Sequence, residues 1–138
     1  MTIFRDISAA LDKHLNEMDG LPDVAWENAN YEPVIGSTFV RPTNIQGDTI
    51  QTSLGTNGND ETEGLYQVDV FTSSNTGKGA AIELADLIGD RFKRGQYLTY
   101  NGVNVRIKQT SRGVGINSDG WYQIPVNIQY LSITAARN

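Results

Sequence analysis

Residues 65–92 read "LYQVDVFTSSNTGKGAAIELADLIGDRF", and this stretch decides the fold class. It begins with LYQVDVFT, where apolar and polar side chains alternate as in a β-strand with one buried face. From Gly77 to about Arg94, apolar residues recur at helical spacing and predict a second element, an α-helix. Its apolar side is expected to hold Ala80, Ala81, Leu84, Leu87, Ile88 and Phe92. A strand that runs through a Gly-Lys-Gly turn into a helix has the outline of a phosphate-binding loop.

The phosphate-binding loop requires Gly-x-x-x-x-Gly-Lys-Ser/Thr, with glycines that wrap the phosphates and a hydroxyl that holds Mg²⁺. Here Thr72 stands where the first glycine is needed, and Gly79 stands where the hydroxyl is needed. The turn therefore predicts a flexible helix entry, capped by Asn75 or Thr76, and not a nucleotide site.

Working outward, apolar residues spaced three and four apart predict a first helix over residues 3–18. "TFVRPTNI" and "TIQTSL" flank "QGD" and are interpreted as a hairpin, whose first strand should be an edge or bulged at Pro42. Asn101-Gly102 predicts a second hairpin. "WYQIPVNIQYLSI" is the longest expected strand. Residues 55–64, "GTNGNDETEG", lack large apolar side chains and predict a mobile, solvated loop.

The expected fold is α+β: a mainly antiparallel sheet with two helices packed on it as a second layer. At 138 residues the chain is expected to be a single domain, 1–138, with one core. The helices are expected to pack on the sheet face that contains Val68, Val70, Ile124, Val126 and Ile128.

Composition excludes several classes of function. The chain has no cysteine, one histidine and a net charge of -5, and its eleven basic residues are spread without a basic block. A nucleic-acid surface needs concentrated positive charge, which argues against one here. No apolar run approaches the roughly 20 residues of a membrane-spanning helix, and the charged N-terminus is not a signal peptide. We expect a non-secreted protein that does not contact a membrane.

Candidate catalytic and metal-binding groups are few. His14 lies on the flank of the first apolar stripe, without a recognisable nucleophile partner. Clustered carboxylates on the second helix could bind Ca²⁺ or Mg²⁺, but an ordinary solvated face is favoured: Glu83, Asp86, Asp90. Polar residues on the strands are either structural pairs or an assembly surface: Asp69, Arg106, Lys108. We therefore predict no enzyme activity, no cofactor and no metal.

Several stretches in order resemble the tail terminator, or tail completion, proteins of long-tailed bacteriophages. They are "LPDVAWENANYEP", "FVRPT", "GLYQVDVF" followed by "GKGAAIELADLI", "LTYNGVNVRI" and "DGWYQIPVNIQY". The resemblance implies a hexameric ring on the head-proximal end of the tail tube, which ends tube growth and docks the head connector. It implies three partners: further copies of the chain, the tube protein and the connector protein. DNA would pass through the lumen without specific binding, and the protein would reside in the virion tail after assembly in the host cytoplasm.

Charged residues in the expected loops are the candidate assembly contacts: Asp60, Glu61, Glu63, Lys78 and Arg112. Two alternatives stay open. The chain is either another head–tail connector or tail tube component, or a small nucleotide-binding protein or enzyme.

Overall fold

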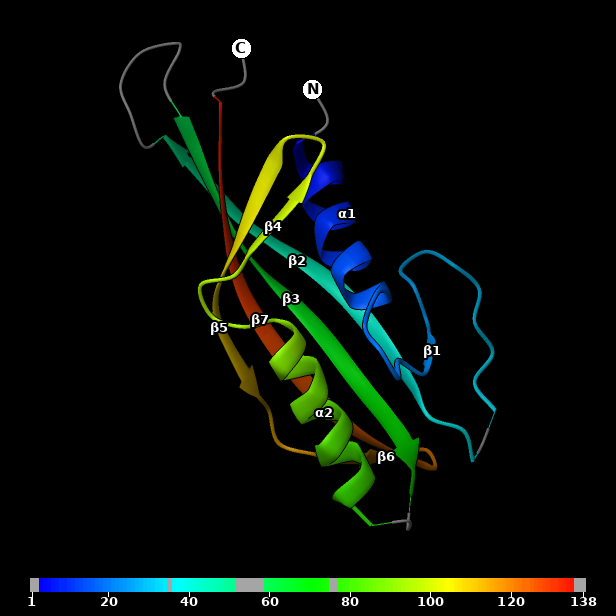
Figure 1. The fold of residues 1–138 in the computed structure, drawn as a ribbon. Helices are drawn as coiled ribbons and strands as arrows, with labels where there is room; N and C mark the ends of the chain where they lie inside the picture. Colours follow the sequence, from blue (N-terminus) through cyan, green and yellow to red (C-terminus); the bar gives the residue numbers. More distant parts are fainter. Residues whose placement is uncertain (1–2, 35, 52–58, 75–76, 136–138) are drawn as a thin grey trace.

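The computed structural model describes residues 3–34, 36–51, 59–74 and 77–135 (Figure 1). Its elements follow in the order α1 (Ile3–Asn16), β1 (Asp23–Val24), β2 (Phe39–Gln51), β3 (Asn59–Ser73), α2 (Gly79–Arg91), β4 (Tyr97–Tyr100), β5 (Val103–Arg112), β6 (Ile116–Ser118) and β7 (Trp121–Ala135). The strands form one sheet in the order β1-β2-β3-β7-β5-β4, and β6 pairs with β7.

The long strands β2, β3 and β7 set the length of the sheet, and β7 lies at its centre. All pairings are antiparallel except that of β1 with β2, which is parallel. β2 is an edge strand beyond Val40, because β1 pairs only with Phe39 and Val40. Pro42 is thus placed in an edge strand, as predicted.

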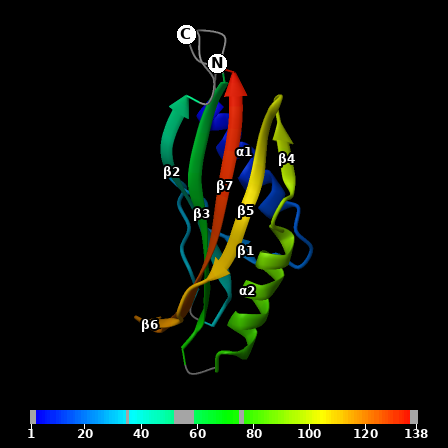
Figure 2. The ribbon, with the colours of Figure 1, turned by 90° about the vertical axis from the view of Figure 1, so that its left-hand side faces the viewer.

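Both helices lie on one face of the sheet (Figures 1 and 2). One cluster of buried apolar side chains joins them to it, with Ile7, Leu11 and Leu15 from α1 and Ile88 from α2. The sheet contributes the residues expected from its alternation: Val68, Val70, Ile124, Val126 and Ile128, each at most 1% exposed. The predicted packing face is therefore confirmed.

The predicted fold class needs correction. The elements are broadly those of an α+β protein, but about half of the structure is strand, and the sheet is curled like half a barrel. The helices therefore fill the concave side of a curved sheet and do not form an even second layer on a flat one. Long strands explain the difference, because strand twist accumulates with length and bends the sheet around whatever it covers.

The helices differ from the predictions in extent and, for α2, in orientation. α1 ends at Asn16, two residues before the predicted end. α2 begins at Gly79 with Lys78 at the N-cap, whose side chain makes no capping hydrogen bond. Its buried residues include Ala85, whereas Leu87, expected inside, is 48% exposed. Small side chains let α2 approach the sheet closely, which turns the larger Leu87 outward.

The two predicted hairpins have different outcomes. The Asn101-Gly102 hairpin is confirmed: both residues have positive φ, and β4 pairs with β5 directly across the turn. The prediction of a hairpin at "QGD" is wrong. β2 runs straight through it, and the register shifts between Gln46 and Thr49 as in a β-bulge. At Gly47 an added Cβ would lie 2.7 Å from the carbonyl oxygen of Glu63, so β3 passes too close for a side chain.

The predicted mobile loop at residues 55–64 is also corrected in part. Residues 59–64 form the first part of β3 and pair with β2 on one side and β7 on the other. Residues 55–58 lie outside the described residues. Backbone pairing on both sides holds this segment in the sheet without large apolar side chains.

Candidate assembly surface

The sheet face opposite the helices, here called the outer face, carries exposed apolar side chains. Strand alternation places Ile45 and Leu65 side by side on it, because they are register partners. Ile50 and Ile133 flank Glu61 in the same way, and each is 54% exposed. Tyr97 on β4 is 66% exposed. Apolar residues gathered on one face, and not scattered singly, are typical of a binding surface.

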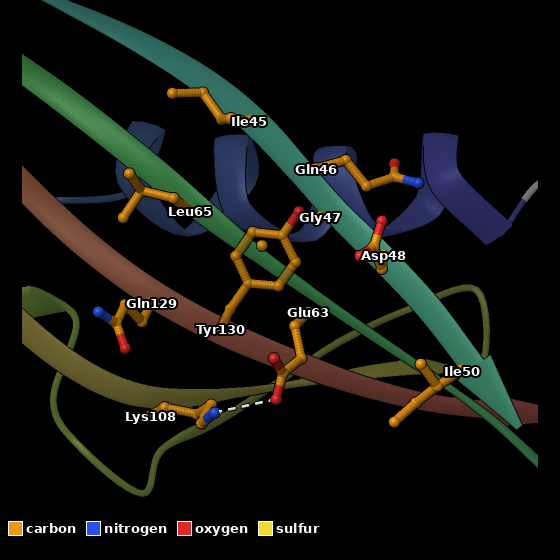
Figure 3. A pocket seen from close by; sticks show the side chains of 11 residues that line it. Ile45, Gln46, Gly47, Asp48, Ile50, Glu63, Leu65, Lys108, Gln129 and Tyr130 are labelled. Atoms are coloured by element: carbon orange, nitrogen blue, oxygen red, sulfur yellow. Dashed lines mark hydrogen bonds and ion pairs between the residues drawn. The ribbon is translucent and has the colours of Figure 1, made fainter. Parts of the chain in front are cut away.

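A groove of 520 Å³ on this face is lined by residues of β2, β3, β7 and β5 (Figure 3). Ile45, Ile50 and Leu65 form its apolar part. Glu63 and Lys108 also line it, and they form an ion pair of 3.1 Å that passes over the intervening strand β7. A smaller hollow of 170 Å³ continues toward β4 and is lined by Tyr97, Asn104, Arg106, Leu131 and Ile133.

The other end of the outer face is closed by aromatic packing. Phe39 stacks on Phe71 with ring centroids 4.5 Å apart, and Trp121 meets Phe39 edge-on at 5.1 Å. Arg41 covers the Phe71 ring at 4.9 Å and contacts the buried carboxylate of Asp69 at 3.5 Å. Here the apolar side chains already have partners within the chain. The groove end of the face is therefore the part left open to another molecule.

The ionisable groups that could have supported chemistry make structural contacts. His14 packs edge-on against Phe92, and its Nε2 lies 2.7 Å from the carbonyl oxygen of Arg91. Burial lowers the pKa of His14. The buried Tyr66 hydroxyl donates a 2.6 Å hydrogen bond to Asp12, and burial raises the pKa of both groups.

No cluster of three or more metal-ligating side chains occurs within the described parts of the chain. Nor does any helix in those parts have the length and apolar character needed to cross a membrane. The Gly77-Lys78-Gly79 turn leads into α2, and the Lys78 side chain is exposed. The prediction that this turn is a helix entry agrees with that geometry, but the N-cap is Lys78, and the predicted caps Asn75 and Thr76 lie outside the described residues.

The five predicted contact residues fall into two groups. Asp60, Glu61 and Glu63 share the first part of β3. Lys78 precedes α2, and Arg112 ends β5 beside the acidic residues Asp86 and Asp90 of that helix. The structure thus brings the acidic residues together and separates them along the sheet from the two basic ones (Figure 1).

Sequence reasoning missed the exposed apolar residues of the outer face. Ile45, Ile50 and Ile133 each occur in segments expected to be strands, but their exposure depends on register. The bulge at Gln46–Thr49 decides on which face of the sheet Ile50 lies. No local sequence pattern indicates that bulge.

The family of phage tail terminator proteins matches residues 6–130, which include α2, most of α1 and at least most of every strand. The chain belongs to the phage tail terminator protein family. The suspected resemblance is therefore confirmed, and the chain is a structural protein of the phage tail. The absence of enzyme activity fits this structural family but stays a prediction.

The fold of this tail terminator family member also occurs in a solved structure. That chain is 21% identical in sequence, matches over 100% of both chains and has a TM-score of 0.74. A likeness at this level of identity concerns the fold alone. No curated protein matches the chain.

Proposed function

We propose that six copies of the protein form a closed ring on the head-proximal end of the tail tube. The ring stops addition of tube subunits and then presents a docking surface to the head connector. The family match over residues 6–130 carries this proposal. The copy number rests on the resemblance of the sequence to tail terminators.

Two physical features support a ring subunit. The outer face leaves an apolar groove of 520 Å³ open, which a neighbouring protein would cover. A net charge of -5 suits a channel through which DNA slides, because a basic lumen would retain phosphates. Contacts that repeat head to tail around the ring close on themselves and end lateral growth.

The test is deletion of the gene followed by electron microscopy of the lysate. We expect overlong or unfinished tails and heads without tails. Normal tails joined to heads would show that the protein is not the terminator. A role as another head–tail connector or tube component would then be the better explanation.

Complementation of the deletion with variants of the protein tests whether the groove takes part in assembly. A variant with Ile45→Asp and Ile50→Asp places charges in the groove and should fail to restore tails while keeping its circular dichroism spectrum. The matched control is Val114→Asp, because Val114 is apolar and 84% exposed but lies outside the groove. Full complementation by the groove variant would remove the groove from the assembly contacts.

A further inference from the structure

The charged residues of the chain are segregated in a way that only the strand order reveals. Residues 17–77, which include β1, β2 and β3, contain ten Asp or Glu residues and a single Lys or Arg, Arg41. Residues 91–118, which include β4 and β5, contain six Lys or Arg residues and no Asp or Glu. Strand β7, residues 121–135, contains no charged residue.

The order of the strands in the sheet places the acidic and the basic segments on opposite sides. β1 and β2 lie at one side of the sheet and β4 and β5 at the other, with the uncharged β7 between the two sides (Figure 1). The sheet therefore has an acidic side and a basic side. In the part of the chain that the structure describes, β2 from Arg41 onward and β4 each pair with one strand only, so both sides end in an open edge.

Pairing within the chain leaves charge of opposite sign exposed on the two sides. Arg41 forms an ion pair with Asp69, and Lys108 forms one with Glu63, so these four charges are compensated within the chain. On the acidic side, Asp23 of β1 and Asp48 of β2 are exposed. On the basic side, the exposed cations near β4 are Lys93, Arg94 and Arg106. Arg112 lies at the end of β5, where it lines a hollow together with Asp86 and Asp90 of α2.

Exposed apolar side chains accompany each set of charges. Ile45 and Ile50 flank Asp48 on β2, and Tyr97 is the register partner of Arg106 at the β4 edge. An interface usually combines an apolar centre, which supplies affinity, with surrounding charges that select the orientation. Each side of the sheet has both parts.

We propose that the acidic β1–β2 side of one copy packs against the basic β4–β5 side of the next copy. The inference rests on the proposed ring and names its lateral surfaces. Two acidic sides or two basic sides repel each other, so the copies associate head to tail and not as two-fold dimers. Head-to-tail association is the arrangement that closes into a ring.

Charge reversal tests the proposal through the oligomeric state of the purified chain, measured by size-exclusion chromatography with light scattering. One variant carries Asp23→Lys and Asp48→Lys, which reverses the two exposed charges named on β1 and β2. A second variant carries Arg94→Glu and Arg106→Glu, which reverses two of the three exposed cations near β4. Each variant alone should associate at least about tenfold more weakly than the wild type, because like charges then face each other.

Mixing the two variants should restore association, because every acidic side then has a basic neighbour around an alternating ring. The control is Glu83→Lys with Asp86→Lys, which makes the same charge change on exposed positions of α2. It should associate like the wild type. Wild-type association should also weaken as salt is raised, since exposed charges are screened.

Three results would overturn the inference. They are normal association of both single-side variants, no rescue on mixing, and a wild-type chain that stays monomeric at every concentration and salt level. None of them bears on whether deletion of the gene alters tail length. Failure of the lateral contact is therefore distinguishable from failure of the terminator role.

Discussion

His14 and Arg91 exchange two hydrogen bonds that join α1 to α2. The His14 Nε2–H donates to the Arg91 carbonyl oxygen at 2.7 Å, and the Arg91 Nε–H donates to the His14 carbonyl oxygen at 2.9 Å. The two helices otherwise meet mainly through the sheet. This reciprocal pair therefore fixes how the helices lie next to each other on the concave side.

The pair predicts a pH dependence of stability. Burial lowers the pKa of His14 from its ordinary value of 6.5, so the folded state favours the neutral ring. The unfolded chain then binds a proton first as the pH falls. The stabilising contribution is full above pH 6.5 and is lost as the pH falls through the folded-state pKa.

We expect the free energy of unfolding of the wild type to fall from about pH 7 to about pH 5, and that of His14→Gln to fall less. Glutamine keeps a donor for Arg91 but does not titrate. Asp12, whose raised pKa acts in the opposite direction, is present in both proteins and cancels in the difference. Urea unfolding measured by tryptophan fluorescence gives both curves. Parallel curves would contradict the assignment.

Burial predicts unequal costs at two apolar positions. Ile124 is fully buried, so Ile124→Ala should lower the free energy of unfolding by about 2–5 kcal/mol. Leu84 is only partly buried against the core, so Leu84→Ala should cost about 1 kcal/mol. Chemical denaturation compares the two. Equal costs would mean that α2 is turned differently on the sheet.

Gly64 and Tyr130 form a matched pair on β3 and β7. They are register partners, and a Cβ at Gly64 would overlap the Tyr130 hydroxyl and ring. Gly64→Ala should therefore cost about 1–3 kcal/mol, because the tyrosine must leave its place and its 2.7 Å hydrogen bond to Asn44. A double-mutant cycle with Tyr130→Leu should show coupling. Additive costs would remove the steric explanation.

Lys78→Ala should change neither the fold nor any interaction with nucleotides. The Lys78 side chain is exposed and makes no capping contact, and the sequence around it lacks the phosphate-loop glycine and hydroxyl. Titration calorimetry with Mg²⁺ and ATP should give no binding heat for wild type or variant. Binding by the wild type that disappears in Lys78→Ala would restore the nucleotide hypothesis.

Neutralising Asp60, Glu61 and Glu63 to Asn and Gln should allow rings to stack. These carboxylates share the first part of β3, and two rings that met there would bury like charges. Negative-stain microscopy of the purified variant would show columns where the wild type shows single rings. The control is Glu63→Gln alone, which breaks the Lys108 ion pair but keeps two of the three charges. Single rings for the triple variant would show that something else prevents stacking.

Much of the fold was predictable where a local sequence pattern is compatible with only one structure. Asn101-Gly102 suits a tight hairpin because both residues accept positive φ, and the structure has it. The alternation around Val68 and Ile124 identified the buried face of the sheet. These patterns depend on residues close in sequence, so no tertiary information was needed.

The failures occurred where one local pattern has two possible structures. A glycine beside polar residues, as in Gln46-Gly47-Asp48, fits a turn and a bulge equally well, and only the approach of β3 at Glu63 decides. Residues 59–64 lack apolar anchors, yet pairing on both sides makes them strand. The charge blocks of residues 17–77 and 91–118 are present in the sequence, but their positions at opposite sides of the sheet depend on the strand order.

The central place of β7 also governs the order in which the protein can fold. β7 is the last of the described strands to be synthesised, and β3 and β5 each pair with β7 but not with each other. A nascent chain that ends before residue 121 therefore exposes an unpaired edge on β3 and another on β5. The acidic and basic sides of the sheet are therefore joined into one subunit only after synthesis has passed this strand.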